Sequence, residues 1–282
     1  MKRYLPIGCV LAAIFMASGV AVCQRVAVLT PDDSETSRRF APLLEQGLKD
    51  VTLIDDDLAR SAFDAAKLNS PYNLTLDEAK QVGQAIGCDF FILLRSAVQR
   101  RSSFEREEYY DAMVAIFLVS TRTGRLVGFA AHGSTESTPE EALRRIDHVI
   151  PGQGGMMVDR ARYAQKEELL AKAPSQMEEP PDENSPAAKA FRAPVPFQRI
   201  KPQYTKLAEQ HGVEATVDMT VDLDETGKVI RTEATRWAGF DLDESVDRAV
   251  RQMNWRPAER NGKFIPMRFV VRYNFKRTDK AK

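Results

Sequence analysis

The chain has 282 residues, enough for two domains of ordinary size, and its 40 Lys and Arg residues balance 40 Asp and Glu residues. Zero net charge disfavours a nucleic-acid-binding protein, and a charged fraction of 28% excludes a membrane-embedded body. Three cysteines cannot build a disulfide scaffold, and the widely spaced His132, His148 and His211 form no zinc-binding pattern. Since there is also no GxSxG or HExxH motif, we expect no enzyme activity, no catalytic residues, no cofactor, no metal and no nucleic-acid partner.

The first residues carry the features of an export signal. Lys2 and Arg3 form a positive end, and the stretch 5–22 that follows contains no charged residue. A sequence typical of a folded strand begins at Arg25, which leaves no spacer after a membrane-spanning helix. We therefore predict that residues 1–24 are a cleaved Sec signal peptide and that the protein is periplasmic. The alternative is a retained anchor in the inner membrane, facing the periplasm, and only then would the protein contact the membrane.

Residues 25–172 are predicted to form an α/β domain. Apolar runs bounded by turn residues predict strands, and apolar residues at helical spacing predict helices between them. The expected strands cover residues 25–30, 51–54, 88–98, 113–120 and 126–131, with helices after residues 34 and 75 and a mostly helical segment at 138–172. Cys88 lies inside an apolar run, so we interpret it as a small buried hydrophobic residue rather than a reactive thiol.

Three polar features of this domain have a structural explanation. The run Asp55–Asp57 suggests a metal or acid–base site, but it follows a predicted strand, where Asp commonly caps the next helix. Thr75 and Glu78 have the spacing of a capping box. The sequence PGQGG at 151–155 lacks the Lys and Ser/Thr of a phosphate-binding loop and does not follow a strand, so we expect it to interrupt a helix.

Short motifs in this domain occur in the order seen in a known group of envelope proteins. They are VAVL at 26–29, IGCDFFIL at 86–93 and STRTGRLV at 120–127. Residues 25–170 thereby resemble the periplasmic α/β domain shared by the TolB N-terminal domain and the CsgG/LpoB-type lipoproteins. The resemblance implies a protein-interaction module, and its partner protein is not identified by the sequence.

A proline-rich segment separates this domain from the rest of the chain. Seven of the fifteen prolines lie between Pro174 and Pro202, among acidic residues that give way to basic ones. Proline fixes φ and removes hydrogen-bond donors, so we predict an extended linker over residues 173–197. We interpret its charges as solvating groups rather than as a specific binding tract.

The pattern after the linker predicts a small α+β domain over residues 198–277, followed by a basic tail at 278–282. Apolar and polar residues alternate strictly from 215 to 223, then a Gly-containing turn leads to a return strand at 228–236. Asp241 is expected to cap a helix with one apolar face, and alternation resumes from 265 to 275. These elements predict a three-stranded antiparallel sheet with helices on one face.

This region resembles the TonB C-terminal domain, found in periplasmic energy transducers. The family's QPQYP occurs as KPQYT at 201–205, and its glycine-led alternating strand occurs over 212–229. Its LD helix motif occurs at 242–243, and its W-x-x-x-P-A-x-x-NG segment occurs in related form over 255–262. The stretch RWAG at 236–239 departs from the Ser-Ser-Gly-like sequence that is common there. The resemblance implies energy-coupled transport, with binding of a TonB box-like segment of an outer-membrane transporter by strand addition beside the final strand.

The edge of the final strand is the candidate binding site, because an edge strand carries unpaired backbone groups that can pair with an extended peptide. The alternation predicts that Val270 faces outward. Arg268 and Arg272 project from the face opposite the core, where they either contact the ligand or form, with Lys276, a solvated face that prevents aggregation. The candidate partner-binding residues are Lys201, Pro202, Gln203, Tyr204, Arg268, Val270 and Arg272. The alternative function is a cell-envelope scaffold or sensor that transmits no force.

Overall fold

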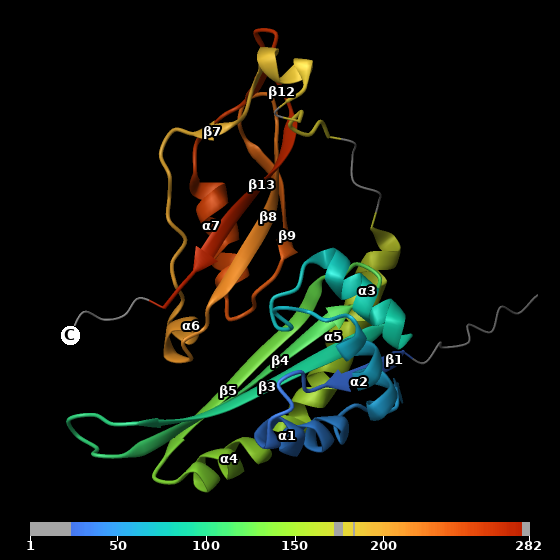
Figure 1. The fold of residues 1–282 in the computed structure, drawn as a ribbon, viewed down its shortest axis with the longest axis vertical. Coiled ribbons are helices and arrows are strands. Elements are labelled where there is room, and N and C mark those ends of the chain that lie inside the picture. Colours follow the sequence, from blue (N-terminus) through green and yellow to red (C-terminus); the bar gives the residue numbers. More distant parts are fainter. Residues whose placement is uncertain (1–23, 172–176, 183, 278–282) are drawn as a thin grey trace, which may run out of the picture.

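The computed structural model describes residues 24–171, 177–182 and 184–277. Figure 1 shows an N-terminal domain and a C-terminal domain stacked along the long axis of the molecule. The predicted leader, except Gln24, and the predicted tail lie outside the described residues. Within the described ranges, no helix combines the length and hydropathy needed to cross a membrane.

The N-terminal domain is an α/β fold with a five-stranded mixed sheet. Its strands are β1 (Arg25–Leu29), β2 (Thr52–Leu53), β3 (Phe90–Arg101), β4 (Tyr109–Ser120) and β5 (Leu126–Glu136). Its helices are α1 (Glu35–Glu45), α2 (Asp56–Ala65), α3 (Leu76–Ile86), α4 (Pro139–Asp147) and α5 (Ile150–Leu170). The strand order is β2-β1-β3-β4-β5, where β1 is parallel to both neighbours and the last three strands are antiparallel.

Side-chain hydroxyls and carboxylates begin the helices where the sequence predicts them. Asp55 accepts a hydrogen bond from Leu58 N at 3.0 Å, so the Asp run caps α2. Thr75 and Glu78 form a reciprocal capping box at α3, and this helix ends at Gly87 with φ +79°.

Cys88 is buried, and burial raises the pKa of its thiol to about 11, which keeps it protonated.

The expectation that residues 151–155 interrupt a helix is wrong. These residues form the first turns of α5, and the chain breaks instead between α4 and α5. The glycines serve close packing: a Cβ on Gly154 would lie 2.4 Å from Leu44 O, and one on Gly47 would lie 1.9 Å from Pro151 O. Glycine is therefore required where the end of α1 meets the start of α5, a tertiary reason that local propensity does not reveal.

The C-terminal domain is an α+β fold built on an antiparallel sheet in the order β13-β8-β9. The elements of this sheet and its helices are α6 (Lys206–Gln210), β8 (Ala215–Leu223), β9 (Val229–Arg236), α7 (Leu242–Gln252) and β13 (Met267–Phe275). Shorter elements are the 3-10 helix Pro186–Ala190, β6 (Phe191–Arg192), β7 (Val195–Pro196), β10 (Trp255–Arg256), β11 (Ala258–Arg260) and β12 (Lys263–Ile265).

Two details of this domain differ from the sequence prediction. Asp241 makes no side-chain cap; it adopts φ +59°, and Asp243 accepts hydrogen bonds from the backbone of the preceding loop instead. The last strand starts at Met267 rather than at 265, because Ile265 pairs with Ala258 in the β11–β12 hairpin. In addition, the end of the predicted linker joins the domain, since β6 pairs with β11 and β7 pairs with β10.

The hydrophobic core explains how the two domains stack. Helices α1, α4 and α5 cover one face of the N-terminal sheet and form a core of their own with it. On the opposite face, α2, α3 and the C-terminal domain contribute to a single continuous core. The C-terminal domain therefore occupies part of the face that a helix layer covers in an ordinary α/β fold.

Candidate partner-binding edge

Strand β13 forms one edge of the C-terminal sheet, because β8 pairs with it on one side only. On the other side, the backbone N–H of Arg268 donates to the carbonyl of Glu178 at 2.8 Å, so this amide points away from β8. Backbone groups alternate in direction along an antiparallel strand, so the amides of Val270, Arg272 and Asn274 point outward too. Among the described residues, these three amides have no backbone partner. The outer edge from Val270 to Asn274 is open to an added strand.

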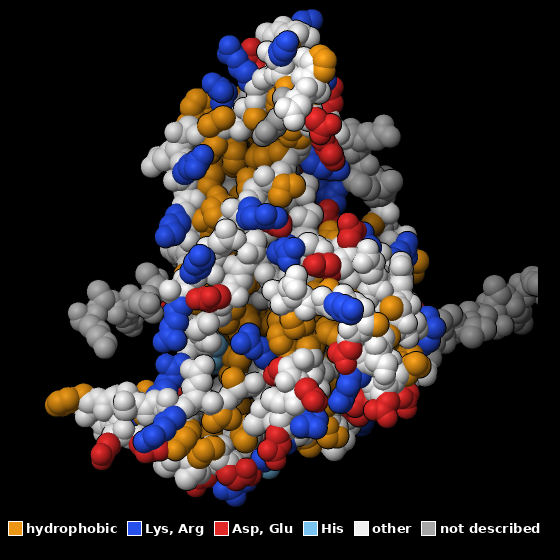
Figure 2. Space-filling model, viewed as in Figure 1, with side chains coloured by type: hydrophobic (Ala, Val, Ile, Leu, Met, Phe, Trp, Pro, Cys, Tyr) orange, Lys and Arg blue, Asp and Glu red, His pale blue; other side chains and the backbone are white. Residues whose placement is uncertain are grey.

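The two faces of β13 differ in character. Phe269, Val271 and Tyr273 are half-buried against the core, and the Phe269 ring meets Trp255 edge-on with centroids 5.1 Å apart. Val270 lies on the opposite face and is 58% exposed. Figure 2 shows hydrophobic side chains gathered over the upper part of the molecule, with Lys and Arg side chains along its margin. An added strand would thus extend a sheet with one apolar and one polar face.

Arg268 and Arg272 form cross-strand ion pairs with β8. Arg268 donates to both oxygens of Asp222 at 2.7 and 2.8 Å, and Arg272 donates to both oxygens of Asp218 at 2.6 and 2.9 Å. The hydrogen bond from Arg272 lowers the pKa of Asp218 below its usual value, because it favours the charged carboxylate. These contacts give both arginines a role within the sheet, and their guanidinium charges are already neutralised.

The KPQYT motif at 201–205 is anchored beside the end of β13. Pro202 is buried, and the carbonyl of Gln203 accepts a hydrogen bond from Ser245 Oγ at 2.7 Å. The Tyr204 hydroxyl donates to Val213 O at 2.7 Å, and its ring stacks on Phe275 with centroids 6.2 Å apart. Lys201 is exposed and has no ion-pair partner among the described residues. The motif therefore holds the domain together, while Lys201 remains accessible.

Glu178 is a contact residue that the sequence analysis did not identify. It belongs to the predicted linker, yet its carbonyl accepts from Arg268 N, and its carboxylate lies 2.7 Å from Arg260 Nη1. The first outward amide of the edge is thus occupied by the chain itself. The sequence signal was weak, because a glutamate in an acidic, proline-rich stretch is typical of a solvated linker.

The edge is held in place relative to the N-terminal domain by a buried aromatic cluster. The Phe240 ring lies 5.9 Å from Phe117 of β4 and 4.9 Å from Phe129 of β5, measured between centroids. Trp237 is 1% exposed, lies 6.0 Å from Phe117 and donates its indole N–H to Gly124 O at 3.1 Å. These contacts join the loop after β9 to the N-terminal sheet.

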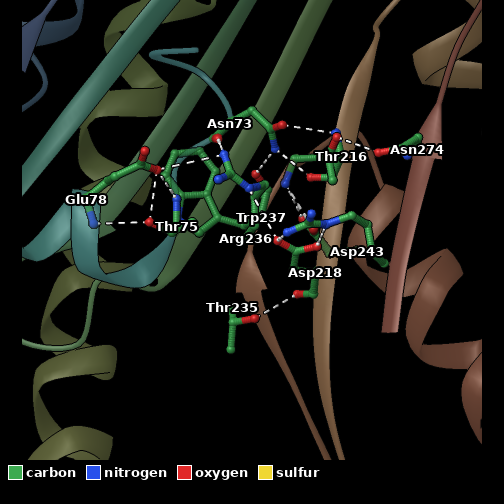
Figure 3. A network of polar contacts seen from close by, with 12 residues as sticks. Asn73, Thr75, Glu78, Thr216, Asp218, Thr235, Arg236, Trp237, Asp243 and Asn274 are labelled. Atoms are coloured by element: carbon green, nitrogen blue, oxygen red, sulfur yellow. Dashed lines mark hydrogen bonds and ion pairs between the residues drawn. The ribbon is translucent and has the colours of Figure 1, made fainter. Parts of the chain in front are cut away.

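A polar network lies beside Trp237, as Figure 3 shows. The side-chain amide of Asn73 donates to the carbonyls of Thr216 and Trp237 at 2.8 and 2.6 Å, and its oxygen accepts from Thr216 N at 3.0 Å. Arg236 donates to Asn73 O at 2.8 Å. Asn73 therefore satisfies backbone groups of both β8 and the loop after β9, which fixes the orientation of the C-terminal sheet.

The interface coincides with the stretch 236–239 that departs from the family pattern. Trp237 fills the interface, and Gly239 has φ +67° with a Cβ position only 2.8 Å from the Phe129 ring. A residue with a side chain would be strained there and would push the aromatic cluster apart. The unusual residues at 236–239 thus have a structural explanation within this chain, which is contact with its own N-terminal domain.

His211 lies at the same interface. It is half-buried beside Phe240, and burial lowers the pKa of its imidazole; Asp111 acts in the opposite sense, while Arg101 and Arg95 reinforce the effect of burial. The described residues contain no group of three or more potential metal ligands. His211 is a packed side chain near an arginine-rich stretch of the N-terminal sheet.

We predict that His211 makes the protein less stable in mild acid. Because its pKa is lower in the folded state, the unfolded chain binds the proton more tightly, so the free energy of unfolding falls as pH drops below about 6.5. Urea unfolding at about pH 5 and about pH 7.5 should show a smaller pH difference for His211→Gln than for the wild type. His148→Gln is the matched control at an exposed helix end, and an equal effect there would contradict the assignment.

Comparison with known proteins identifies the C-terminal domain. Residues 200–277 match the family model described as Gram-negative bacterial TonB protein C-terminal, so the resemblance inferred from the sequence is confirmed for this domain. No protein with curated annotation matches the chain. The solved TonB C-terminal domain of Pseudomonas aeruginosa is 17% identical, and the match covers 38% of this chain and 100% of that one with a TM-score of 0.28.

Two further solved structures are among the matches. A lipoprotein of Neisseria meningitidis is 13% identical, with 46% of this chain and 96% of that chain covered and a TM-score of 0.33. The LpoB C-terminal domain of Salmonella enterica is 16% identical, with 42% and 86% covered and a TM-score of 0.24. Lipoproteins of this kind are the group that the weaker resemblance of residues 25–170 named.

Proposed function

We propose that this protein binds an extended segment of a partner protein along the outer edge of β13, in the periplasm. The observation that carries the proposal is the bond from Arg268 N to Glu178 O, since it gives the direction of the outward amides and demonstrates one main-chain contact at this edge. The family match of residues 200–277 supports a TonB-like role. We propose a TonB box-like segment of an outer-membrane transporter as the partner, and energy-coupled transport as the process.

The candidate residues contribute to this proposal in different ways. The backbone of Val270, Arg272 and Asn274 would pair with the added strand, and the exposed Val270 and Lys201 side chains would flank it. The buried parts of the 201–205 motif and the ion pairs of Arg268 would hold the edge in shape. Affinity would therefore come mainly from main-chain hydrogen bonds, and specificity from the side chains on either face of the added strand.

Proline substitution at alternate positions of β13 tests the edge. Val270→Pro removes an outward N–H, so we expect a retained fold and roughly fivefold weaker binding, which corresponds to one net hydrogen bond. Val271→Pro is the matched control: it removes an inward N–H that pairs with β8, and it is expected to unfold the domain. Circular dichroism monitors folding, and titration with a synthetic TonB box-like peptide monitors binding. A folded Val270→Pro variant that binds normally would contradict the proposal.

The interface at Trp237 favours the second candidate function, a scaffold or sensor that transmits no force. A buried contact of this kind fixes the binding edge on the N-terminal domain instead of leaving it free on a tether. A force transducer would need the anchor at 5–22 to remain in the inner membrane. Mass spectrometry of the mature protein separates the two functions: a start near Gln24 supports the scaffold, and an intact Met1 in the membrane fraction supports the transducer.

A further inference from the structure

The exposed side of α5 carries large apolar residues at a regular spacing. Val149, directly before the helix, and Met156, Tyr163 and Leu170 within it occur at every seventh position, and their exposed fractions are 40%, 51%, 62% and 71%. The opposite side of the helix is buried against the sheet. Single exposed apolar residues are ordinary, but a seven-residue repeat places these four along one narrow stripe of the helix surface.

Charged residues flank this stripe on both sides. Asp159 and Arg160 lie on the N-terminal side of Tyr163, and Lys166 and Glu167 lie on its C-terminal side; all four are exposed. The contact of Asp159 with Arg162 is long, at 3.9 Å, and the other three have no ion-pair partner within the described ranges. Asp159 and Lys166 lie on one flank of the stripe, and Arg160 and Glu167 lie on the other, so each flank carries one negative and one positive charge.

A second helix of the same sequence fits this face in the antiparallel direction. When the second helix runs in the opposite direction and the two Tyr163 residues lie level with each other, Met156 of one copy lies beside Leu170 of the other. This arrangement also brings Asp159 beside Lys166 and Arg160 beside Glu167, so that both charged pairs are opposite in sign. In a parallel pair, Asp159 would instead lie beside Arg160 of the second copy and Lys166 beside Glu167, so the charges alone permit both directions, and the antiparallel one is favoured by the opposed helix macrodipoles. The pattern is therefore complementary to itself about a two-fold axis.

We propose that a second copy of this chain docks on the exposed face of α5, antiparallel to it, with the two-fold axis at Tyr163. The face lies on the helix layer behind the N-terminal sheet, on the side away from the C-terminal domain. Each copy in such a dimer contributes one β13 edge. The dimer presents two binding edges in a fixed relation.

Sedimentation equilibrium of the full chain tests this arrangement by charge exchange. Asp159→Lys and Lys166→Asp each create like-charge contacts at two symmetric positions, so each variant should dimerise about five- to tenfold more weakly. The double variant Asp159→Lys/Lys166→Asp restores opposite charges and should dimerise like the wild type. A mixture of the two single variants should form a heterodimer preferentially. Restoration of this kind is expected only from antiparallel pairing.

Removal of the central aromatic tests the apolar part of the interface. Tyr163→Arg should weaken the dimer about 30-fold, and its exposure means that the fold should be kept, as circular dichroism will verify. Leu58→Arg is the matched control, because Leu58 is 60% exposed on α2, outside the stripe, and dimerisation should be unchanged. A monomeric wild type, a Tyr163→Arg variant that dimerises normally, or a double charge exchange that fails to restore the dimer would each overturn the proposal.

Discussion

Replacing Trp237 by alanine is expected to lower the free energy of unfolding by about 3–5 kcal/mol, the usual loss for a buried aromatic side chain. Trp237 is 1% exposed, and its indole N–H is bonded to Gly124 O across the domain interface. Its loss would leave a cavity beside Phe117 and an unsatisfied carbonyl in the β4–β5 turn. Urea unfolding should show the loss directly, and the two domains should then unfold in separate transitions.

A second buried tryptophan provides the matched control. Trp255 is 6% exposed, but its indole N–H donates to Val250 O at 3.1 Å within the C-terminal domain. Trp255→Ala should therefore destabilise that domain while leaving hydrogen exchange at 72–76 and 121–131 unchanged. Trp237→Ala should increase exchange in both segments, since it removes the side-chain bond to Gly124 O and loosens the loop whose backbone N–H at residue 237 donates to Leu74 O. Unaltered exchange in the Trp237 variant would mean that the interface contributes little to stability.

Replacing Arg268 by alanine is expected to destabilise the protein by about 3 kcal/mol, because it leaves a buried carboxylate without its partner. Asp222 is 3% exposed, and both of its oxygens accept from Arg268. Arg272→Ala is the matched control with a smaller expected loss. The side chain of Arg272 is 64% exposed, and Asp218 keeps a second ion pair with Arg236 at 3.4 Å.

A double-mutant cycle separates the two explanations offered for Arg268. A double-mutant cycle between Arg268→Ala and Asp222→Ala should show strong coupling in the free energy of unfolding if the ion pair holds the strands together. Peptide titration at a temperature where the variants remain folded should then show little change in affinity. Unchanged stability together with a large loss of binding would instead identify Arg268 as a ligand contact.

The parts of the fold that depend on local pattern were predictable from the sequence. The alternation from Ala215 to Leu223 predicts both the strand and its buried face. The structure has strand β8 over these residues, and β8 pairs with β13 along its whole length. Asn261 and Gly262 both adopt positive φ in the turn between β11 and β12, as an Asn-Gly pair favours. Such features can be predicted because each depends on the conformational preferences of a few adjacent residues.

The features that the sequence did not reveal depend on contacts between distant residues. Gly154 favours a helix break by its own propensity, but close packing against α1 keeps it inside α5. Phe191 and Val195 pair with residues more than 50 positions away, so nothing nearby marks them as strands. Trp237 was visible as a departure from the family pattern, yet the surface that it contacts is supplied by another domain.

Because Glu178 O accepts from Arg268 N, the chain itself occupies part of the β13 edge and competes there with an incoming strand. A tethered group acts at an effective concentration set by its tether, so it is always present whatever the concentration of the partner. A strand that pairs along the entire edge must displace the Glu178 carbonyl, whereas one that starts at Val270 need not. Titrations of the full chain will therefore yield an apparent dissociation constant that depends on the register of the incoming strand as well as on its sequence.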